Sequence, residues 1–154
     1  MENNLKFNSA ICTSRVQSEH LLSLGLKKET ADMTIHIKGD GGWYVTAEPF
    51  YEWEDDMNTL PSLEETEQIL PAWSLGRLIE MMPSPIPISE DLPTFRYYAH
   101  LNLSNMSVGY YWEDYDGEGR ALVGFSGNGL FAAVVDATEW LIKEGNFPKE
   151  YLEE

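Results

Sequence analysis

Residues 114–119 carry the alternating acids and glycines of a calcium-binding loop. An EF-hand loop needs oxygen ligands at its first and twelfth positions and glycine at its sixth. With Gly117 in the sixth position, the first is Trp112 and the twelfth is Val123, and neither side chain can bind calcium. The segment therefore does not fit an EF-hand, and its Asp-Gly step predicts a hairpin turn.

Residues 127–132 read G-x-G-x-x-A and follow a predicted strand, as in dinucleotide-binding folds. Such folds also need a second parallel strand whose acidic residue binds the ribose. Only 22 residues follow Ala132, and most of them form one predicted helix. We therefore expect no cofactor here. The glycines let the chain turn and Asn128 caps the helix, which leaves room for at most a small anion.

A catalytic set has few candidate members in this chain. Residues 124–128 depart from the nucleophile-elbow pattern, because Asn128 stands where glycine is required. No two His or Cys residues have the spacing of zinc ligands, and Cys12 has no neighbouring base. We expect Cys12 to be a small buried or half-buried side chain. The sequence thus predicts no catalytic residues and no metal, and it favours a function other than catalysis.

An acidic band between Gly39 and Gly76 contains nine carboxylates and neither Lys nor Arg. They are Asp40, Glu48, Glu52, Glu54, Asp55, Asp56, Glu64, Glu65 and Glu67. Nucleic acids and anionic membranes repel such a surface, so neither is expected as a partner. The band therefore predicts a protein partner, and its charge favours a basic one, with Glu52, Glu54, Asp55 and Asp56 as candidate binding residues.

A second candidate binding surface lies on the polar side of a predicted hairpin. Arg96, Tyr98 and His100 alternate with apolar residues along one strand, and Tyr111 lies across from them. Aromatic side chains beside a cation are typical of recognition surfaces. Trp73 completes this candidate set, because a pocket between the sheet and the helices could place it near Tyr98 and His100.

Hydrophobic periodicity predicts the elements that position these side chains. Strands are expected over 33–38, 43–47, 95–103, 106–112 and 120–126, and helices over 14–24, 74–82 and 129–144. The predicted fold is therefore α+β. An antiparallel sheet of about five strands ends in a three-strand meander, and about three helices pack mainly on one face. Ser14 or Thr13, Asn128, Gly25 and Gly145 are the predicted helix ends.

The composition indicates a single acidic domain over residues 1–154, with a net charge of -16 and 43% hydrophobic residues. Residues 1–11 are expected to be a loose arm or short edge strand, and 48–70 an irregular acidic excursion. Residues 83–93 are Pro-rich and predict an extended connector. One cysteine, no signal-like start and no long apolar run lead us to expect a cytoplasmic protein.

Four segments carry a resemblance to a known group of proteins. They are residues 17–26, 29–33, 70–83 and 133–145, of which the Pro-Ala-Trp-Ser-Leu helix start at 71–75 is the most specific. Together they resemble small uncharacterised proteins of gut Bacteroidetes, often encoded in phage-like or other mobile elements. The resemblance implies an accessory role in such an element and transfers no activity.

The function that these observations predict is a non-enzymatic, protein-binding accessory factor of a mobile element. One alternative is a DNA mimic, in which a rigid ridge of carboxylates from 48–67 occupies a basic DNA-binding protein. Another is a small enzyme or ligand-binding domain, whose pocket would bring His100 together with a carboxylate. A homo-oligomer joined through a sheet edge or face is the third.

Overall fold

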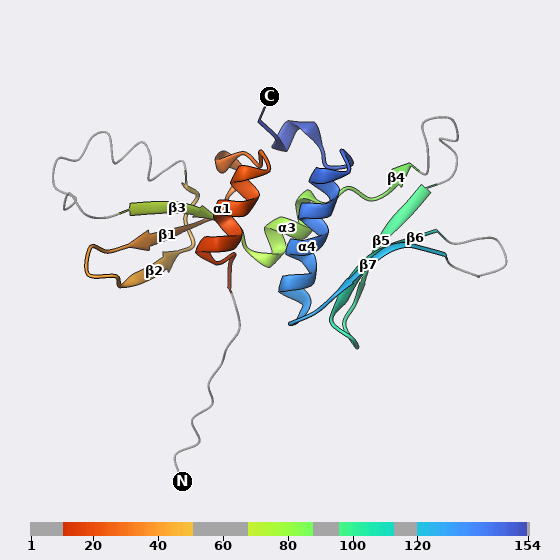
Figure 1. The fold of residues 1–154 in the computed structure, drawn as a ribbon, viewed down its shortest axis with the longest axis horizontal. Helices are drawn as coiled ribbons and strands as arrows, with labels where there is room; N and C mark the ends of the chain where they lie inside the picture. The colour runs from red at the N-terminus through yellow and green to blue at the C-terminus, as the bar shows by residue number, and fades with distance from the viewer. Residues whose placement is uncertain (1–10, 51–67, 88–95, 113–119, 154) are drawn as a thin grey trace, which may run out of the picture.

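The computed structural model describes residues 11–50, 68–87, 96–112 and 120–153 (Figure 1). In chain order the elements are α1 (Arg15–Ser23), η1 (Lys28–Thr30), β1 (Met33–Ile37), β2 (Trp43–Thr46), β3 (Gln68–Ala72), α3 (Leu75–Met81), β4 (Ile86–Pro87), β5 (Arg96–Asn102), β6 (Ser107–Trp112), β7 (Arg120–Ser126), α4 (Leu130–Lys143) and η2 (Lys149–Tyr151). The predicted α+β class is confirmed. The calcium-loop-like turn and the arm before residue 11 lie outside the described residues.

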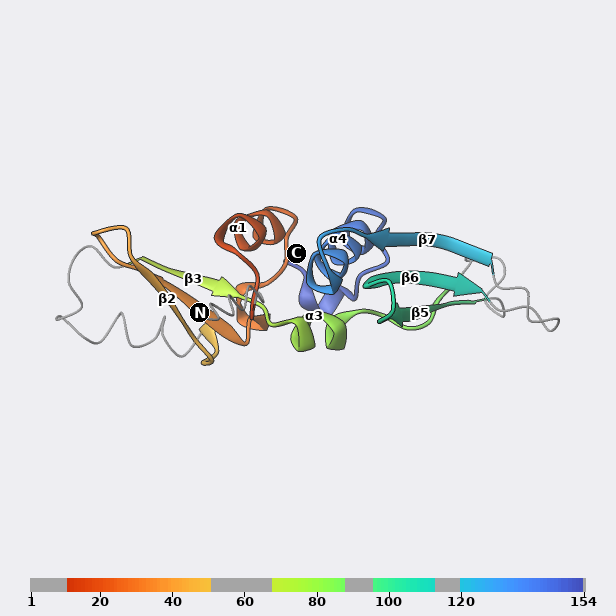
Figure 2. The ribbon, with the colours of Figure 1, turned by 90° about the horizontal axis from the view of Figure 1, so that it is seen from below.

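Helices α1, α3 and α4 of the described residues lie in the middle of an elongated molecule, with one sheet at each end of its long axis (Figures 1 and 2). The strand order is β2-β1-β3 in the first sheet and β4-β5-β6-β7 in the second, and every pairing is antiparallel. The strands thus divide between two sheets, whereas the sequence predicted one sheet of about five strands.

The first sheet contains two predicted strands and one that the sequence did not reveal. β1 pairs with β2 through Ile35↔Val45, and with β3 through Ile35↔Leu70. β3 overlaps the end of the stretch 48–70, which was predicted to be irregular. Its short run and internal Pro71 hide it from pattern analysis, because proline is depleted in strands and tolerated mainly at edges.

The second sheet contains the predicted C-terminal meander, which is confirmed. β5 pairs with β6 and β6 with β7, and the two-residue strand β4 is added beside β5. The register shifts by one residue where Tyr110 pairs with Val123 and Tyr111 with Ala121. Leu122 is therefore the extra residue of a β-bulge, which bends strand β7.

Helices α1 and α3 begin where the sequence predicts. The Ser14 side chain accepts a hydrogen bond from the Gln17 backbone, and the Gln17 side chain accepts one from the Ser14 backbone, which makes a capping box. Gly25 follows α1 with φ 92°, as expected of the residue that ends a helix. Ser74 caps α3 in the same way, by accepting from the Arg77 backbone.

Two local predictions about the helices are wrong. Asn128 does not cap α4, because the N-cap position belongs to Gly129, which makes no side-chain bond. The helical spacing of Val16, Leu21 and Leu24 in the sequence predicts that Val16 lies on the apolar face of α1, yet Val16 is 74% exposed. The face of α1 that is buried contains Ser18 and Leu21 instead.

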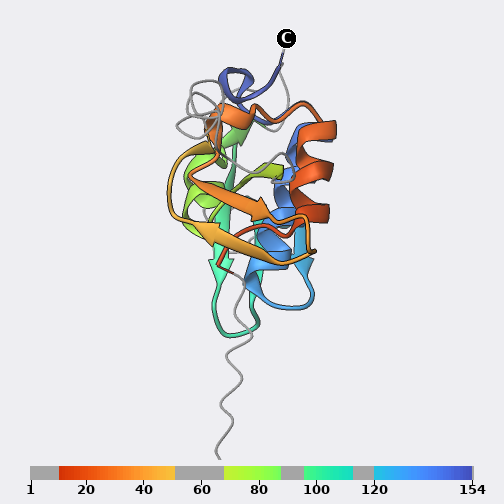
Figure 3. The same ribbon diagram turned by 90° about the vertical axis from the view of Figure 1, so that its left-hand side faces the viewer.

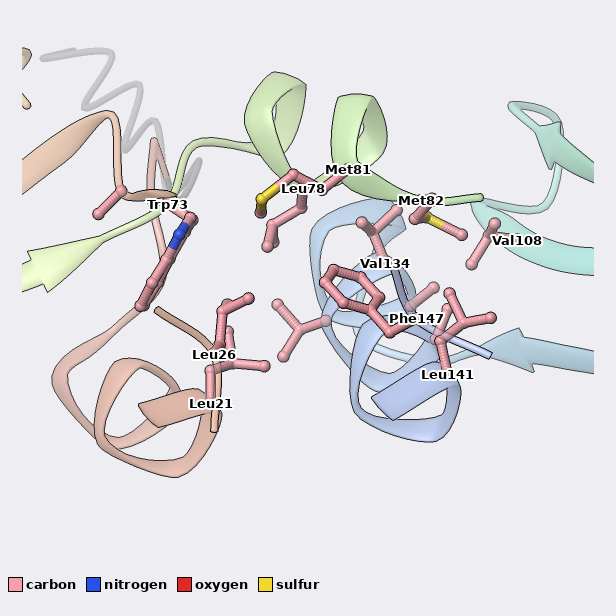
Figure 4. Packing of buried hydrophobic residues seen from close by; sticks show 14 of the residues in the cluster. Leu21, Leu26, Trp73, Leu78, Met81, Met82, Val108, Val134, Leu141 and Phe147 are labelled. Atoms are coloured by element: carbon pink, nitrogen blue, oxygen red, sulfur yellow. The ribbon is translucent and has the colours of Figure 1, made fainter. Parts of the chain in front are cut away.

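The main hydrophobic core joins the helices to the inner face of the second sheet (Figure 4). Leu21 and Leu26 pack near α3, and Val134 and Leu141 of α4 lie beside Phe147. Trp140 of α4 contacts the rings of Tyr110 and Phe125, with centroids about 6 Å apart. Helix α4 therefore covers the apolar face of β6 and β7.

A second, smaller cluster lies on the first sheet. Its buried members are Cys12, Ile35 and Ala72. Partly buried apolar side chains surround them: Met33, Ile37, Val45 and Leu70. In Figure 3, which faces the first sheet, the β1–β2 hairpin lies in the foreground and α1 stands to one side of it. The apolar face of this sheet is thus covered only in part.

Candidate functional site

The β1–β2 hairpin is the framework of the candidate site. Its turn is closed by the Lys38 backbone N–H, which donates to the carbonyl of Gly42 at 2.8 Å. Asp40 Oδ1 accepts from the Gly42 backbone at 2.8 Å, and Gly41 has φ 85°, a conformation that favours glycine. These contacts fix the register that pairs Ile37 with Trp43.

The polar face of this hairpin is ordered by ring stacking and hydrogen bonds. The rings of His36 and Tyr44 stack with centroids 4.4 Å apart and planes 5° apart. His36 Nε2 lies 3.1 Å from Thr46 Oγ1, and Thr34 Oγ1 donates to the Glu48 carbonyl at 3.0 Å. Because His36 is 1% exposed, we assign it a role in fixing the hairpin.

The opposite face of the hairpin forms an apolar groove of about 870 Å³. Its walls come from both hairpin strands and from the chain that leads into α1. The lining residues are Ile11, Cys12, Thr13, Ser14, Arg15, Ile35, Ile37, Gly41, Trp43 and Val45. We call this hollow the Trp43 groove.

The second wall of the Trp43 groove is held by the core. The Thr13 backbone donates to the Trp73 carbonyl at 2.9 Å, and the Trp73 backbone donates to Thr13 Oγ1 at 3.0 Å. Thr13 Oγ1 also lies 2.7 Å from Ser18 Oγ. The backbones of Cys12 and Ser74 pair in an isolated antiparallel β-bridge. The groove is therefore a fixed feature of the fold.

Three large apolar side chains at the Trp43 groove and the start of α1 are exposed to solvent. Trp43 is 70% exposed, Ile11 61% and Val16 74%. Soluble monomers seldom expose clustered apolar side chains without a use for them, and such patches mark interaction sites. Tryptophan is also among the residues most enriched at the energetic centres of protein interfaces.

Cys12 lines the groove and is the one thiol among its lining residues, so its reactivity bears on what the groove can do. Burial raises the pKa of the Cys12 thiol, and the negative charge of Asp32 raises it further. A raised pKa keeps the thiol protonated near neutral pH, and the protonated form is a poor nucleophile. Cys12 therefore contributes apolar surface to the groove.

The second sheet brings most of the predicted aromatic surface together. Tyr98 pairs directly with Tyr111, and the rings of His100 and Tyr111 meet edge to face with centroids 5.4 Å apart. Arg96 lies on the same strand and is exposed. Tyr98 is 49% exposed. These four residues form a shared surface, as the alternation of the sequence predicted.

Trp73 does not belong to that surface, and its assignment as a binding residue is wrong. It is 0% exposed, and its Nε1 donates to Thr30 Oγ1 at 2.9 Å inside the core. Tyr98 and His100 lie on the exposed face of the other sheet. The predicted pocket between these three residues is therefore not formed.

The acidic candidates lie outside the described residues. Glu52, Glu54, Asp55 and Asp56 fall within the stretch 51–67, so the carboxylate ridge of the DNA-mimic hypothesis stays a prediction. Phe50, just before that stretch, is 7% exposed and belongs to the main core.

A second hollow of about 480 Å³ lies beside α3 and has a structural explanation. Asp32 accepts from the Ser74 backbone at 2.8 Å and from its hydroxyl. Arg77 Nε donates to the Thr30 carbonyl at 2.9 Å, and its guanidinium bonds Glu80 at 2.7 Å. These polar groups are engaged in holding the start of α3. Within the described residues, no group of three or more His, Cys, Asp or Glu could hold a metal ion.

Sequence reasoning assigned Trp43 to a strand and missed the groove. The signal was present in the alternation of β1 and β2, which places Ile35, Ile37, Trp43 and Val45 on one face. What the sequence did not reveal is that the helices gather around the other sheet's core. Only the tertiary arrangement leaves this face without a helix among the described residues.

Comparison with protein-family models, with curated proteins and with solved structures finds no match for this chain. No helix in the described ranges is both long enough and apolar enough to cross a membrane. The groove and the aromatic surface are therefore the features from which a function can be argued.

Proposed function

We propose that this protein is a non-enzymatic binding protein that holds an apolar segment of a partner protein in the Trp43 groove. The observation that carries the proposal is the 70% exposure of Trp43 beside an apolar hollow of about 870 Å³. Burying one large apolar side chain contributes about 1.5–3 kcal/mol, so closing this groove would stabilise a complex substantially.

The polar groups of the groove favour a protein partner over a small molecule. Small-molecule sites combine an apolar lining with a few polar groups that converge on the ligand. Here the Thr13 hydroxyl is engaged by Ser18 and by the Trp73 backbone. The Arg15 guanidinium bonds Glu19 at 2.8 Å. Little polar chemistry is left to orient a small ligand, whereas an apolar protein segment needs none.

The charge of the chain supports a basic partner. With a net charge of -16, the protein attracts cationic surfaces and repels nucleic acid and anionic lipid. Such attraction speeds association and weakens as salt is added. The resemblance to proteins of mobile elements would make this an accessory factor encoded by such an element.

Site-specific photo-crosslinking tests the proposal. A benzoylphenylalanine in place of Trp43 is compared with the same residue in place of Leu122, which is 43% exposed on the second sheet. In cells that encode the protein, we expect position 43 to crosslink to a specific basic protein and position 122 not to. Excess wild-type protein should compete the adduct away, and the Trp43→Ser variant should not.

The same experiment can overturn the proposal. Equal crosslinking at positions 43 and 122, or competition by Trp43→Ser as effective as that by wild type, would show that the groove does not select a partner. Because Trp43 is mostly exposed, Trp43→Ser should unfold at the denaturant midpoint of the wild type, and this measurement serves as the folding control.

A further inference from the structure

Strand β2 is the edge of the first sheet, and its pairing shows which backbone groups face outward. The sheet order places β1 on one side of β2 and no described strand on the other. The Lys38–Gly42 backbone bond identifies that position as a hydrogen-bonded pair. Such pairs alternate along an antiparallel ladder, so Tyr44 and Thr46 bond to β1. The N–H and C=O groups of Trp43 and Val45 therefore point to the open edge.

The same two residues line the Trp43 groove with their side chains. Trp43 and Val45 thus offer two kinds of contact at one place, namely backbone hydrogen-bonding groups along the edge and apolar side chains on the adjoining face. In an added antiparallel strand, a residue bonded opposite Trp43 or Val45 would project its side chain onto this face. An incoming strand would therefore fill the groove with every second side chain.

The other described sheet edges carry features that oppose strand addition. β3 contains Pro71, and the chain at Cys12 and Thr13 is bonded beyond its end to Ser74 and Trp73. β4 is two residues long and includes a proline. β7 is bulged at Leu122. Prolines, shortness and bulges are the means by which proteins block unwanted strand pairing.

Strand β2 has none of these features. Its four residues contain no proline, no charged side chain and no bulge. Exposed acids stand at both ends of the strand, Asp40 in the turn before it and Glu48 shortly after it. Of the nearby cations, Arg15 is paired with Glu19, and the Lys38 ammonium lies over the Tyr44 ring on the opposite face of the hairpin, 5.5 Å from the ring centroid. The charge around this edge is therefore complementary to a cationic segment.

We infer that β2 binds its partner by strand addition: an extended segment with alternating apolar residues and flanking Lys or Arg pairs with the Trp43 and Val45 backbone. This inference rests on the proposed function and specifies how the groove is occupied. Main-chain bonds supply part of the affinity, and the groove selects the alternate side chains, as in other cases of strand addition.

Backbone methylation of a probe peptide tests the inference. The probe is a seven-residue peptide with valine at alternate positions, threonine between them and lysine at both ends. Two methylated versions keep every side chain: one carries N-methyl groups on the valines and the other on the threonines. Binding to the full chain is followed by amide and indole NMR shifts. The expected outcome is that the parent and the threonine-methylated peptide bind and shift the Trp43 and Val45 amides.

The valine-methylated peptide should bind at least roughly tenfold more weakly, because it loses the donors that face β2. Equal binding by both methylated peptides, with shifts confined to side chains of the groove, would overturn strand addition and leave groove binding intact. Absence of binding by the parent peptide would also overturn it, and the crosslinking at position 43 then decides separately whether the proposed function stands.

Discussion

Helix α4 lies across the apolar face of the second sheet, whereas no helix in the described part of the chain lies across that of the first. Val108 and Tyr110, on the covered face, are 1% and 0% exposed. Trp43, on the uncovered face, is 70% exposed. Both sheets are antiparallel and have one apolar side. They differ in whether the fold itself supplies the second layer.

This difference indicates where the molecule can bind. A sheet face must be buried against another layer, and in the second sheet α4 provides it. In the first sheet, residues 11–15 cover only part of the face and leave a groove. The second sheet therefore contributes mainly to stability, and the first retains exposed apolar surface, where we propose that a partner binds.

The largest expected effect in this comparison comes from truncating one apolar side chain against each sheet. Leu141→Ala removes a fully buried side chain of α4 and should lower the free energy of unfolding by about 3 kcal/mol. Ile37→Ala removes a half-buried side chain at the groove and should cost about 1 kcal/mol. Urea unfolding measures both, and equal losses would contradict the assignment of stability to the covered sheet.

The outer face of the second sheet gives the next test. A Cβ at Gly109 would lie 2.8 Å from the Val123 carbonyl oxygen and 2.8 Å from the Tyr111 ring. Gly109→Ala should therefore cost about 2 kcal/mol, because the backbone oxygen cannot move aside. At the paired Gly124 the nearest atom, Tyr111 Oη, is 3.7 Å away, so Gly124→Ala should change stability by less than about 0.5 kcal/mol.

Those two variants also test the aromatic surface. If Tyr111 is held over Gly109, Gly109→Ala should shift the His100 ring protons in NMR, because the two rings meet at 5.4 Å. Gly124→Ala should leave them unchanged. Similar destabilisation by both substitutions would show that the ring does not lie against Gly109 and that this surface is less ordered than the geometry indicates.

The regular elements could be predicted because local signals determine them. Alternation in residues 33–37 and 107–112 and the Ser14 cap each specify structure within a few residues. β3 could not be predicted, because its pairing partner lies more than 30 residues away and its proline argues against a strand. Long-range pairing determines its structure, and no local pattern encodes it.

The candidate site was predictable only in part, for the same reason. The aromatic surface on β5 and β6 follows from alternation within one hairpin. The sequence could therefore indicate that Arg96, Tyr98, His100 and Tyr111 share one face. Trp73 was predicted to line a pocket near Tyr98 and His100, yet the core encloses it. The Trp43 groove is open because α4 packs on the other sheet, and the local sequence of β2 gives no information about where α4 packs.

Alkaline pH provides a third test, through Tyr110 of the covered sheet. Burial raises the pKa of Tyr110 above its ordinary value of 10.0, and its hydroxyl donates to the Pro83 carbonyl at 2.6 Å. Tyr110→Phe should cost about 1 kcal/mol at neutral pH. Above pH 10 the unfolded chain loses this proton while the folded protein keeps it, so wild-type stability should fall as pH rises.

The steepness of that fall distinguishes the wild type from Tyr110→Phe. Tyr110→Phe lacks the titrating group, so its stability should fall less steeply than that of the wild type above pH 10, and the gap between them should narrow. Urea midpoints measured from neutral to alkaline pH show this directly. Parallel pH curves would mean that Tyr110 is not enclosed and that α4 covers the sheet less completely.

The two hairpin turns give the test with the smallest expected effects, in which one substitution should raise the free energy of unfolding and the other should lower it. The β1–β2 turn has Gly41 at φ 85°, whereas the β5–β6 turn has Met106 at φ 52°. A side chain in this left-handed region costs roughly 1 kcal/mol, and Met106 is 49% exposed, so it loses little packing when removed. Met106→Gly should therefore raise the free energy of unfolding by about 0.5 kcal/mol, and Gly41→Ala should lower it by about 1 kcal/mol. A loss of stability in Met106→Gly would show that the Met106 side chain packs in the β5–β6 turn. The turn of the second sheet, like its apolar face, would then contribute to stability.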